Sequence, residues 1–223
     1  MKNIMKAHPD KVYGIALNDA NGGTDPYETP YINALQSYFI AGSSVSSFEF
    51  PCGAISRSTS PESDYANSCI MSKSSWNAQV NAELAKPANC RIGLVTKESG
   101  DMLTIDAYVG YNSSVSGNTN LTIMLIEGDL PDGPGGQAGG GTGFMNQHVL
   151  RHIITANIRN PIELNSSKKY TLMKFKNVNI AGKYKTKANL KLVAFANIDA
   201  SETKNYAILN AQEASLNEIK KFD

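Results

Sequence analysis

The stretch at residues 101–111, which reads DMLTIDAYVGY, carries apolar residues at every second position. Leu103 and Ile105 fall on one side of an extended chain, whereas Thr104 and Asp106 fall on the other. A strand with one face in a core and one face in water has this two-residue period. The stretch therefore predicts a half-buried β-strand.

Five further strands are predicted between this stretch and the C-terminus. Residues 121–126, LTIMLI, form a nearly continuous apolar run. The other predicted strands cover residues 148–158, 170–178, 190–198 and 206–211. Six strands that are separated by polar turns, with no helix between them, predict an antiparallel β-sandwich domain over residues 99–223.

The first 98 residues alternate between strand and helix patterns and predict an α/β domain. In chain order, the predicted elements are a buried strand at 12–17, a helix that begins at Thr29 and Pro30, an extended segment at 48–56, a helix that begins at Ser75 and a strand at 91–96. The fold class is therefore α+β, with a domain boundary near residue 98.

The composition excludes several classes of protein. The 21 basic and 20 acidic residues nearly balance, which argues against a nucleic-acid binder and against an electrostatic membrane anchor. No run of about 18 apolar residues is present, so no transmembrane segment is predicted. Residues 1–11 lack the apolar core of a signal peptide.

The cysteines and histidines indicate neither a cofactor nor a metal site. Cys52, Cys69 and Cys90 form no C-x-x-C pair, and their spacing fits no zinc motif. They are either partly buried thiols or include one Cys52–Cys69 disulfide formed in an oxidising compartment. On a strand, His148 and His152 would lie about 13 Å apart, too far to share a metal ion. No serine nucleophile motif is present, and no catalytic residue is predicted.

Four segments together resemble one protein family. They are PCGAISR at 51–57, the tryptophan that opens a helix at Trp76, the run from LTIMLIEGDLP to NQHVLR at 121–151, and LKLVAFANIDASETKNYAILNAQ at 190–212. The chain looks like the 28-kilodalton outer membrane protein related family of Gram-negative bacteria. Members are typically exported and often lipid-anchored, with a thioredoxin-like front and a β-sandwich behind.

The resemblance gives structural roles to residues of the first domain. It implies that Phe50–Pro51 is the cis-proline bond of a thioredoxin-like fold, and that Arg57 and Trp76 belong to the same structural motif. The family generally begins with a strand and a cysteine-containing turn, whereas this chain opens inside the first helix. We therefore expect the natural protein to be longer, because a sheet without that strand would leave backbone groups unpaired.

Two residues of the NQHVLR segment have predicted structural roles. Arg151 would share a strand face with apolar Val149 and Ile153, so it needs a charged partner. Glu127, at the end of the neighbouring strand, is the expected partner. His148 is predicted to form a hydrogen bond with a loop.

These features favour a non-catalytic protein of the cell envelope, located in the periplasm or at the outer membrane of a Gram-negative bacterium. Its role would be structural or interactive, with an unidentified protein or glycan partner. One alternative is a thiol–disulfide oxidoreductase whose catalytic cysteines lie upstream of this sequence. Another is a small-ligand or glycan-binding module that uses loops at the end of the sandwich.

Overall fold

The structure is a computed structural model of the chain. It describes residues 1–18, 25–40, 51–58, 68–112, 115, 118–131, 143–155, 160–161, 169–199 and 207–222.

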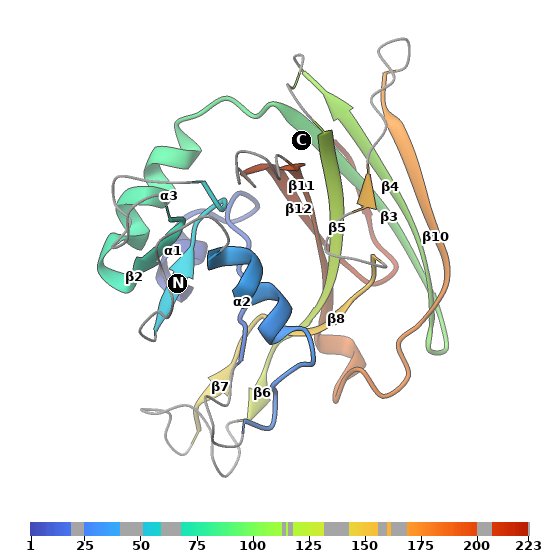
Figure 1. The fold of residues 1–223 in the computed structure, drawn as a ribbon. Coiled ribbons are helices and arrows are strands. Elements are labelled where there is room, and N and C mark those ends of the chain that lie inside the picture. The colour runs from blue at the N-terminus through green and yellow to red at the C-terminus, as the bar shows by residue number, and fades with distance from the viewer. Residues whose placement is uncertain are drawn as a thin grey trace.

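Two antiparallel sheets make up the second half of the chain and lie face to face (Figure 1). The four-stranded sheet has the order β10 (Thr171–Asn179), β4 (Met102–Tyr111), β3 (Cys90–Ser99) and β13 (Ile219–Lys220). The five-stranded sheet consists of β12 (Ile208–Ser215), β11 (Leu190–Asp199), β5 (Asn118–Glu127) and β8 (Val149–Ile153), with β9 (Asn160–Pro161) also paired to β5. The antiparallel, β-rich architecture predicted from the sequence is confirmed.

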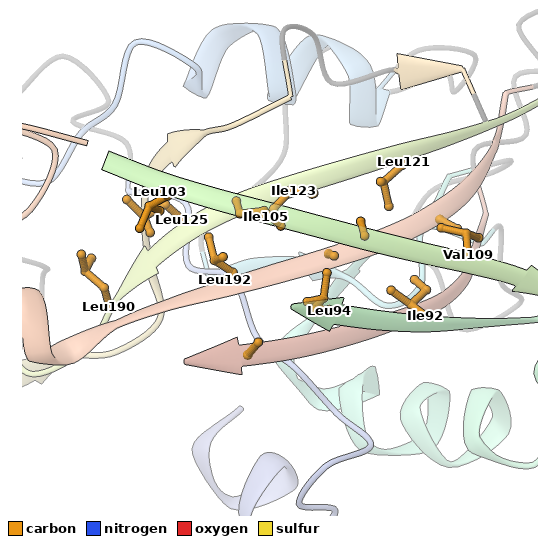
Figure 2. Close-up of a cluster of buried hydrophobic side chains, with 14 of the residues drawn as sticks. Ile92, Leu94, Leu103, Ile105, Val109, Leu121, Ile123, Leu125, Leu190 and Leu192 are labelled. Carbon is orange, nitrogen blue, oxygen red and sulfur yellow. The ribbon is translucent and has the colours of Figure 1, made fainter. Parts of the chain in front are cut away.

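The main core fills the space between these two sheets (Figure 2). On β4, Leu103 and Ile105 are buried, whereas the alternate residues Thr104 and Asp106 remain partly exposed. The alternation predicted for this strand is therefore correct. Each fully buried aliphatic side chain contributes roughly 1.5–3 kcal/mol of stability, so this core is the main source of cohesion.

Strand β5 of the five-stranded sheet is buried on both faces. Leu121, Ile123 and Leu125 of β5 point into the sandwich core, and Met124 and Ile126 belong to a second cluster on the opposite face. That second cluster is completed by helix α2 (Ile32–Ile40) and by the extended residues 12–17. In Figure 1, α2 lies across the face of β5 and β8 that points away from the four-stranded sheet.

The remaining elements are short. They are α1 (Lys2–Ala7), β1 (Cys52–Ala54), β2 (Ile70–Ser72), the 3-10 turn η1 (Lys73–Ser75), α3 (Trp76–Leu84), β6 (Leu130–Pro131), β7 (Met145–Asn146) and the 3-10 turn η2 (Lys187–Asn189). Both helices predicted from their start signals are present as α2 and α3. The pairs β1–β2 and β6–β7 form two small antiparallel sheets. Ile55, Met71 and Val80 form a small cluster where α3 packs on the β1–β2 hairpin.

The predicted thioredoxin-like domain is not confirmed. Among the described residues before β3, β1 and β2 are the only strands, and they pair antiparallel with each other. Residues 12–17, predicted as a buried strand, instead make a single parallel bridge, between Ala16 and Val149 of β8. These residues and α2 have no sheet of their own to cover, so they bury their apolar side chains against the five-stranded sheet.

The boundary expected between residues 98 and 99 falls inside a β-hairpin. Strand β3 pairs with β4 over its whole length, from Cys90 opposite Tyr111 to Ser99 opposite Met102. The connecting turn uses Gly100 at a φ of 59°, a conformation that costs glycine little. The sandwich therefore begins at Cys90. The local pattern of residues 91–96 identified a strand but contained no information about its pairing partner.

Candidate functional site

The acidic residue and the arginine singled out in the sequence form an ion pair at the edge of the five-stranded sheet. Arg151 Nε lies 3.3 Å from Glu127 Oε2, which confirms the predicted pair. The pairing of β5 with β8 skips one residue, because Leu125 lies opposite His152 and Ile126 opposite Leu150. Arg151 is the extra residue of this β-bulge. A bulge interrupts the alternation of side chains, which frees Arg151 from the apolar face expected for it.

The Glu127 carboxylate joins three segments of the chain. It is fully buried and accepts hydrogen bonds from the backbone N–H groups of Lys185, at 2.9 Å, and Thr186. Arg151 Nε also donates to the carbonyl oxygen of Lys183, at 3.1 Å. The end of β5 and the middle of β8 are thereby fixed to the loop that precedes η2. Buried charges are tolerated only when they are paired and hydrogen-bonded in this way.

Tyr27 forms one wall of the same cluster. Its ring is 2% exposed and lies 5.2 Å from Lys185 Nζ and 5.9 Å from Arg151 Cζ, within the range of cation–π contacts. Its hydroxyl donates to the carbonyl oxygen of Pro131 in β6. Sequence reasoning missed Tyr27, since it stands in a polar loop about 100 residues before the residues that it contacts. We call Glu127, Arg151, Tyr27 and Lys185 the ion-pair cluster.

His148 has a backbone role beside this cluster. Its φ is 58°, in the left-handed region, and its carbonyl oxygen accepts a 2.7 Å hydrogen bond from Ala16 N. This bond attaches the extended residues 12–17 to β8. Burial lowers the pKa of the His148 ring below its ordinary value, with Lys191 adding to the effect and Glu213 and Asp129 opposing it.

His152 connects β8 to the helical layer. Its Nδ1 atom and the hydroxyl of Tyr31, next to the start of α2, form a 2.6 Å hydrogen bond. Burial, and to a smaller extent the charge of Lys183, lowers the pKa of His152. In the parts of the chain that the structure describes, no group of three or more His, Cys, Asp or Glu residues could hold a metal ion.

Arg57 and Trp76 lie away from the ion-pair cluster, in the N-terminal layer. The Arg57 guanidinium is 8% exposed and lies 4.8 Å from the ring centroid of Phe195 on β11. Trp76 Nε1 donates to the carbonyl oxygen of Met71, at 3.3 Å, and its ring lies so close to Gly53 that an added Cβ would be 3.1 Å away. Trp76 therefore packs on the β1–β2 hairpin, and Arg57 connects the segment after β1 to β11.

Pro51 is exposed and directly precedes β1. The Phe50–Pro51 bond that was expected to be cis lies outside the described residues, because Phe50 is not among them.

The cysteines do not form the disulfide considered for them. Cys52 pairs with Ser72 in the β1–β2 hairpin, and Cys69 precedes Ser72 by three residues. At a rise of about 3.3 Å per residue, the two cysteines are displaced by roughly 10 Å along the hairpin, beyond the ~7 Å limit for a bridge. Cys52, Cys69 and Cys90 all lie in described segments and are present as thiols. The Cys52–Cys69 disulfide is therefore wrong for this structure.

Two of the thiols are poor nucleophiles. Burial raises the pKa of Cys90 to about 12. It also raises the pKa of Cys69, although the charge of Arg57 opposes this effect. Since the thiolate is the reactive form, both sulfur atoms are protonated and inert near neutral pH.

The chain is a β-sandwich in which a helical layer covers the five-stranded sheet and a buried ion pair lies at the edge of that sheet. The family model described as outer membrane protein Omp28 matches residues 41–220, and the chain belongs to this family. The resemblance noted in the sequence is thereby confirmed. The chain is extracytoplasmic and associated with the outer membrane of Gram-negative bacteria.

Two solved structures are similar to the chain. HBP35 of Porphyromonas gingivalis is 16% identical and superposes with a TM-score of 0.69 over 85% of this chain, which spans 59% of that protein's length. A domain of the outer membrane lipoprotein Omp28 from Porphyromonas gingivalis is 15% identical, with a TM-score of 0.37, 59% of this chain covered and 91% of that one. No curated protein matches the chain. Within the described residues, no helix is long and apolar enough to span a membrane.

Proposed function

We propose that this chain is a non-catalytic protein of the cell envelope with an interaction or structural role at the outer membrane or in the periplasm. One observation carries the proposal. Glu127 and Arg151, two charged residues of the 121–151 run that resembles the family, are both engaged in bonds that hold the sandwich together. The buried Glu127 carboxylate already accepts hydrogen bonds from backbone N–H groups and pairs with Arg151, which favours a structural role for it.

The chemistry of the thiols also favours a role other than disulfide exchange. An oxidoreductase needs a thiolate that is accessible and has a depressed pKa. The pKa values of Cys69 and Cys90 are shifted in the opposite direction, by burial. Cys52, the most accessible of the three, lies in a short β-hairpin with Ser72 as its cross-strand partner.

Binding to native outer membranes tests the proposal. Purified chain is incubated with outer-membrane vesicles from a Gram-negative strain that lacks the protein, and the bound fraction is measured by sedimentation. We expect saturable binding, which trypsin-treated chain does not show. An absence of saturable binding would overturn the interaction role.

A catalytic readout accompanies this measurement. In an insulin-reduction assay with dithiothreitol, we expect the chain to give the same rate as the buffer control. The variant Cys52→Ser serves as the matched comparison, because it removes the most accessible thiol. A rate above background that Cys52→Ser abolishes would contradict the non-catalytic assignment.

A further inference from the structure

The two sheets of the sandwich differ in what covers their outer faces. In Figure 1, no helix or strand of the described chain lies over the side of β10, β4 and β3 that points away from the core. The register identifies the side chains on this outer face, because they alternate with core residues. They are Arg91, Val95 and Lys97 on β3, Met102, Thr104, Asp106 and Tyr108 on β4, Leu172, Lys174 and Lys176 on β10, and Ile219 on β13.

An aromatic cluster occupies one end of this face. The Tyr108 ring meets Tyr170 edge-on at a centroid distance of 5.3 Å, and it meets Phe222 edge-on at 6.5 Å. Gly93 lies beneath this C-terminal segment, since an added Cβ would lie 3.3 Å from the carbonyl oxygen of Lys220 and 3.7 Å, an ordinary contact distance, from the Phe222 ring. The C-terminal segment therefore places an aromatic ring on the sheet.

The apolar side chains of this end remain in contact with water. The exposed fractions are 68% for Ile219, 41% for Tyr170, and 37% for both Leu172 and Phe222. We call these four residues the apolar patch. Exposed aromatic rings that gather in one patch are typical of interfaces, and tyrosine also joins a polar hydroxyl to an apolar ring.

Cations surround the apolar patch. The outward positions of β3, β4 and β10 include four basic residues, Arg91, Lys97, Lys174 and Lys176, and a single acid, Asp106. Asp106 is paired with Lys174 at 3.4 Å, and the Arg91 guanidinium lies 5.9 Å from the Phe222 ring centroid. The near-neutral charge of the whole chain thus conceals a locally basic face, which complements an anionic surface.

We propose that this face docks on an anionic lipid surface, with the apolar patch in the interfacial layer and Arg91, Lys97 and Lys174 against the phosphate groups. The proposal rests on the proposed function at the envelope and names the partner. Interfacial tyrosines and long basic side chains suit this arrangement, since both keep a polar end in water. Anionic lipid attracts each nearby basic residue, and the apolar side chains add contact that salt does not screen.

The edge of the same sheet disfavours a protein partner that would add a strand. Strand β10 is the outer strand of the sheet, and its pairing with β4 is interrupted by an irregularity between Phe175 and Val178. Lys174 and Lys176 also project from this edge strand. Bulges and lysines on an edge strand hinder pairing with another chain. The face of the sheet, and not its edge, is therefore the available docking surface.

Sedimentation with vesicles of defined composition tests the proposal on the full chain. Vesicles of phosphatidylcholine with about one third phosphatidylglycerol are compared with phosphatidylcholine alone. We expect preferential binding to the anionic vesicles. We expect Lys97→Gln to lower the partition coefficient about fivefold, because this is the usual effect of losing one basic residue near an anionic surface. Leu172→Ser should also lower the partition coefficient. Raised salt should weaken the binding of the wild-type chain to the anionic vesicles.

Two control variants match these changes on the opposite side of the molecule. Lys73→Gln removes an exposed lysine beside α3, and Leu84→Ser removes a leucine that is 36% exposed on α3. Both are expected to bind like the wild-type chain. All four substituted side chains are exposed, so the urea midpoint of each variant should stay close to that of the wild type, which separates a docking defect from unfolding.

Equal binding to both kinds of vesicle, no binding to either, or equal losses in test and control variants would overturn the inference. Binding to native outer-membrane vesicles without binding to lipid vesicles would leave the proposed function intact and assign the partner to protein or glycan. Failure to bind either preparation would overturn both proposals.

Discussion

The two sheets of the sandwich share one core but differ on their outer faces. Strand β5 of the five-stranded sheet is buried at nine of its ten positions, whereas β4 of the four-stranded sheet alternates between buried and partly exposed residues. The five-stranded sheet needs its second apolar face covered, and α2 with residues 12–17 does this. The four-stranded sheet needs no second apolar layer for folding, and in Figure 1 no helix or strand of the described residues covers its outer face.

The outer faces of the two sheets differ in how much their side chains contribute to stability. Side chains such as Leu35, Met124 and Phe195 on the covered face are at most 4% exposed, and they contribute to stability. The apolar patch on the bare face is well exposed and contributes little to it. Three substitution experiments test this distinction.

The largest effect is expected at Glu127, where covered strand β5 ends. Replacing Glu127 with Ala removes the acceptor for Lys185 N and Thr186 N and leaves Arg151 without its carboxylate. Loss of one partner of a buried pair costs about 4 kcal/mol in the free energy of unfolding. Urea denaturation monitored by circular dichroism measures this loss in the free energy of unfolding.

Glu127→Gln is the matched control, because its amide keeps the size of the side chain and one acceptor oxygen. We expect its loss of stability to be smaller than that of Glu127→Ala. If Glu127→Ala loses less than about 1 kcal/mol, the ion-pair cluster does not have the structural role described above.

The next effect compares two leucines, one on each sheet. Leu35 on α2 is 1% exposed and packs on the covered sheet, whereas Leu172 is 37% exposed on the bare one. We expect Leu35→Ala to lower the free energy of unfolding by about 3 kcal/mol, through lost burial and the cavity left behind. Leu172→Ala should change it by about 0.5 kcal/mol or less. Similar losses at both positions would refute the distinction between the two faces.

The smallest effect is a pH dependence at His152, where α2 meets β8. Burial, aided by Lys183, lowers the pKa of His152 in the folded chain, so the folded state favours the neutral ring. The associated stability is fully present above the ordinary pKa of 6.5 and is lost as the pH falls through the lowered value. The urea midpoint should therefore decrease as the pH is lowered from 7.5 to about 5.

His152→Gln should flatten this pH profile without removing the dependence completely. His148 also has a lowered pKa, mainly because of burial, and contributes with the same sign. A His152→Gln profile that runs parallel to the wild type would show that the Tyr31–His152 contact has no part in the pH response.

Part of the ion-pair cluster could be predicted from the sequence. The pairing of Arg151 with Glu127 followed from the cost of leaving an arginine among apolar neighbours, and the structure contains that pair. The bulge at Arg151, the N–H donors of Lys185 and Thr186, and the ring of Tyr27 could not be predicted. Each depends on segments that are distant in sequence, and local periodicity does not report on such contacts.

Local periodicity by itself determined the longer strands of the sandwich, since the spacing of apolar residues reflects whether one face or both faces of a strand are buried. Start signals at Thr29–Pro30 and Ser75 also placed α2 and α3 to within two residues, although Ser75 makes no side-chain capping hydrogen bond. Only the tertiary structure decided that β3 pairs with β4 and that residues 12–17 border β8. Strand partners are selected by the total apolar surface that the complete fold buries. No single segment of the sequence determines that surface.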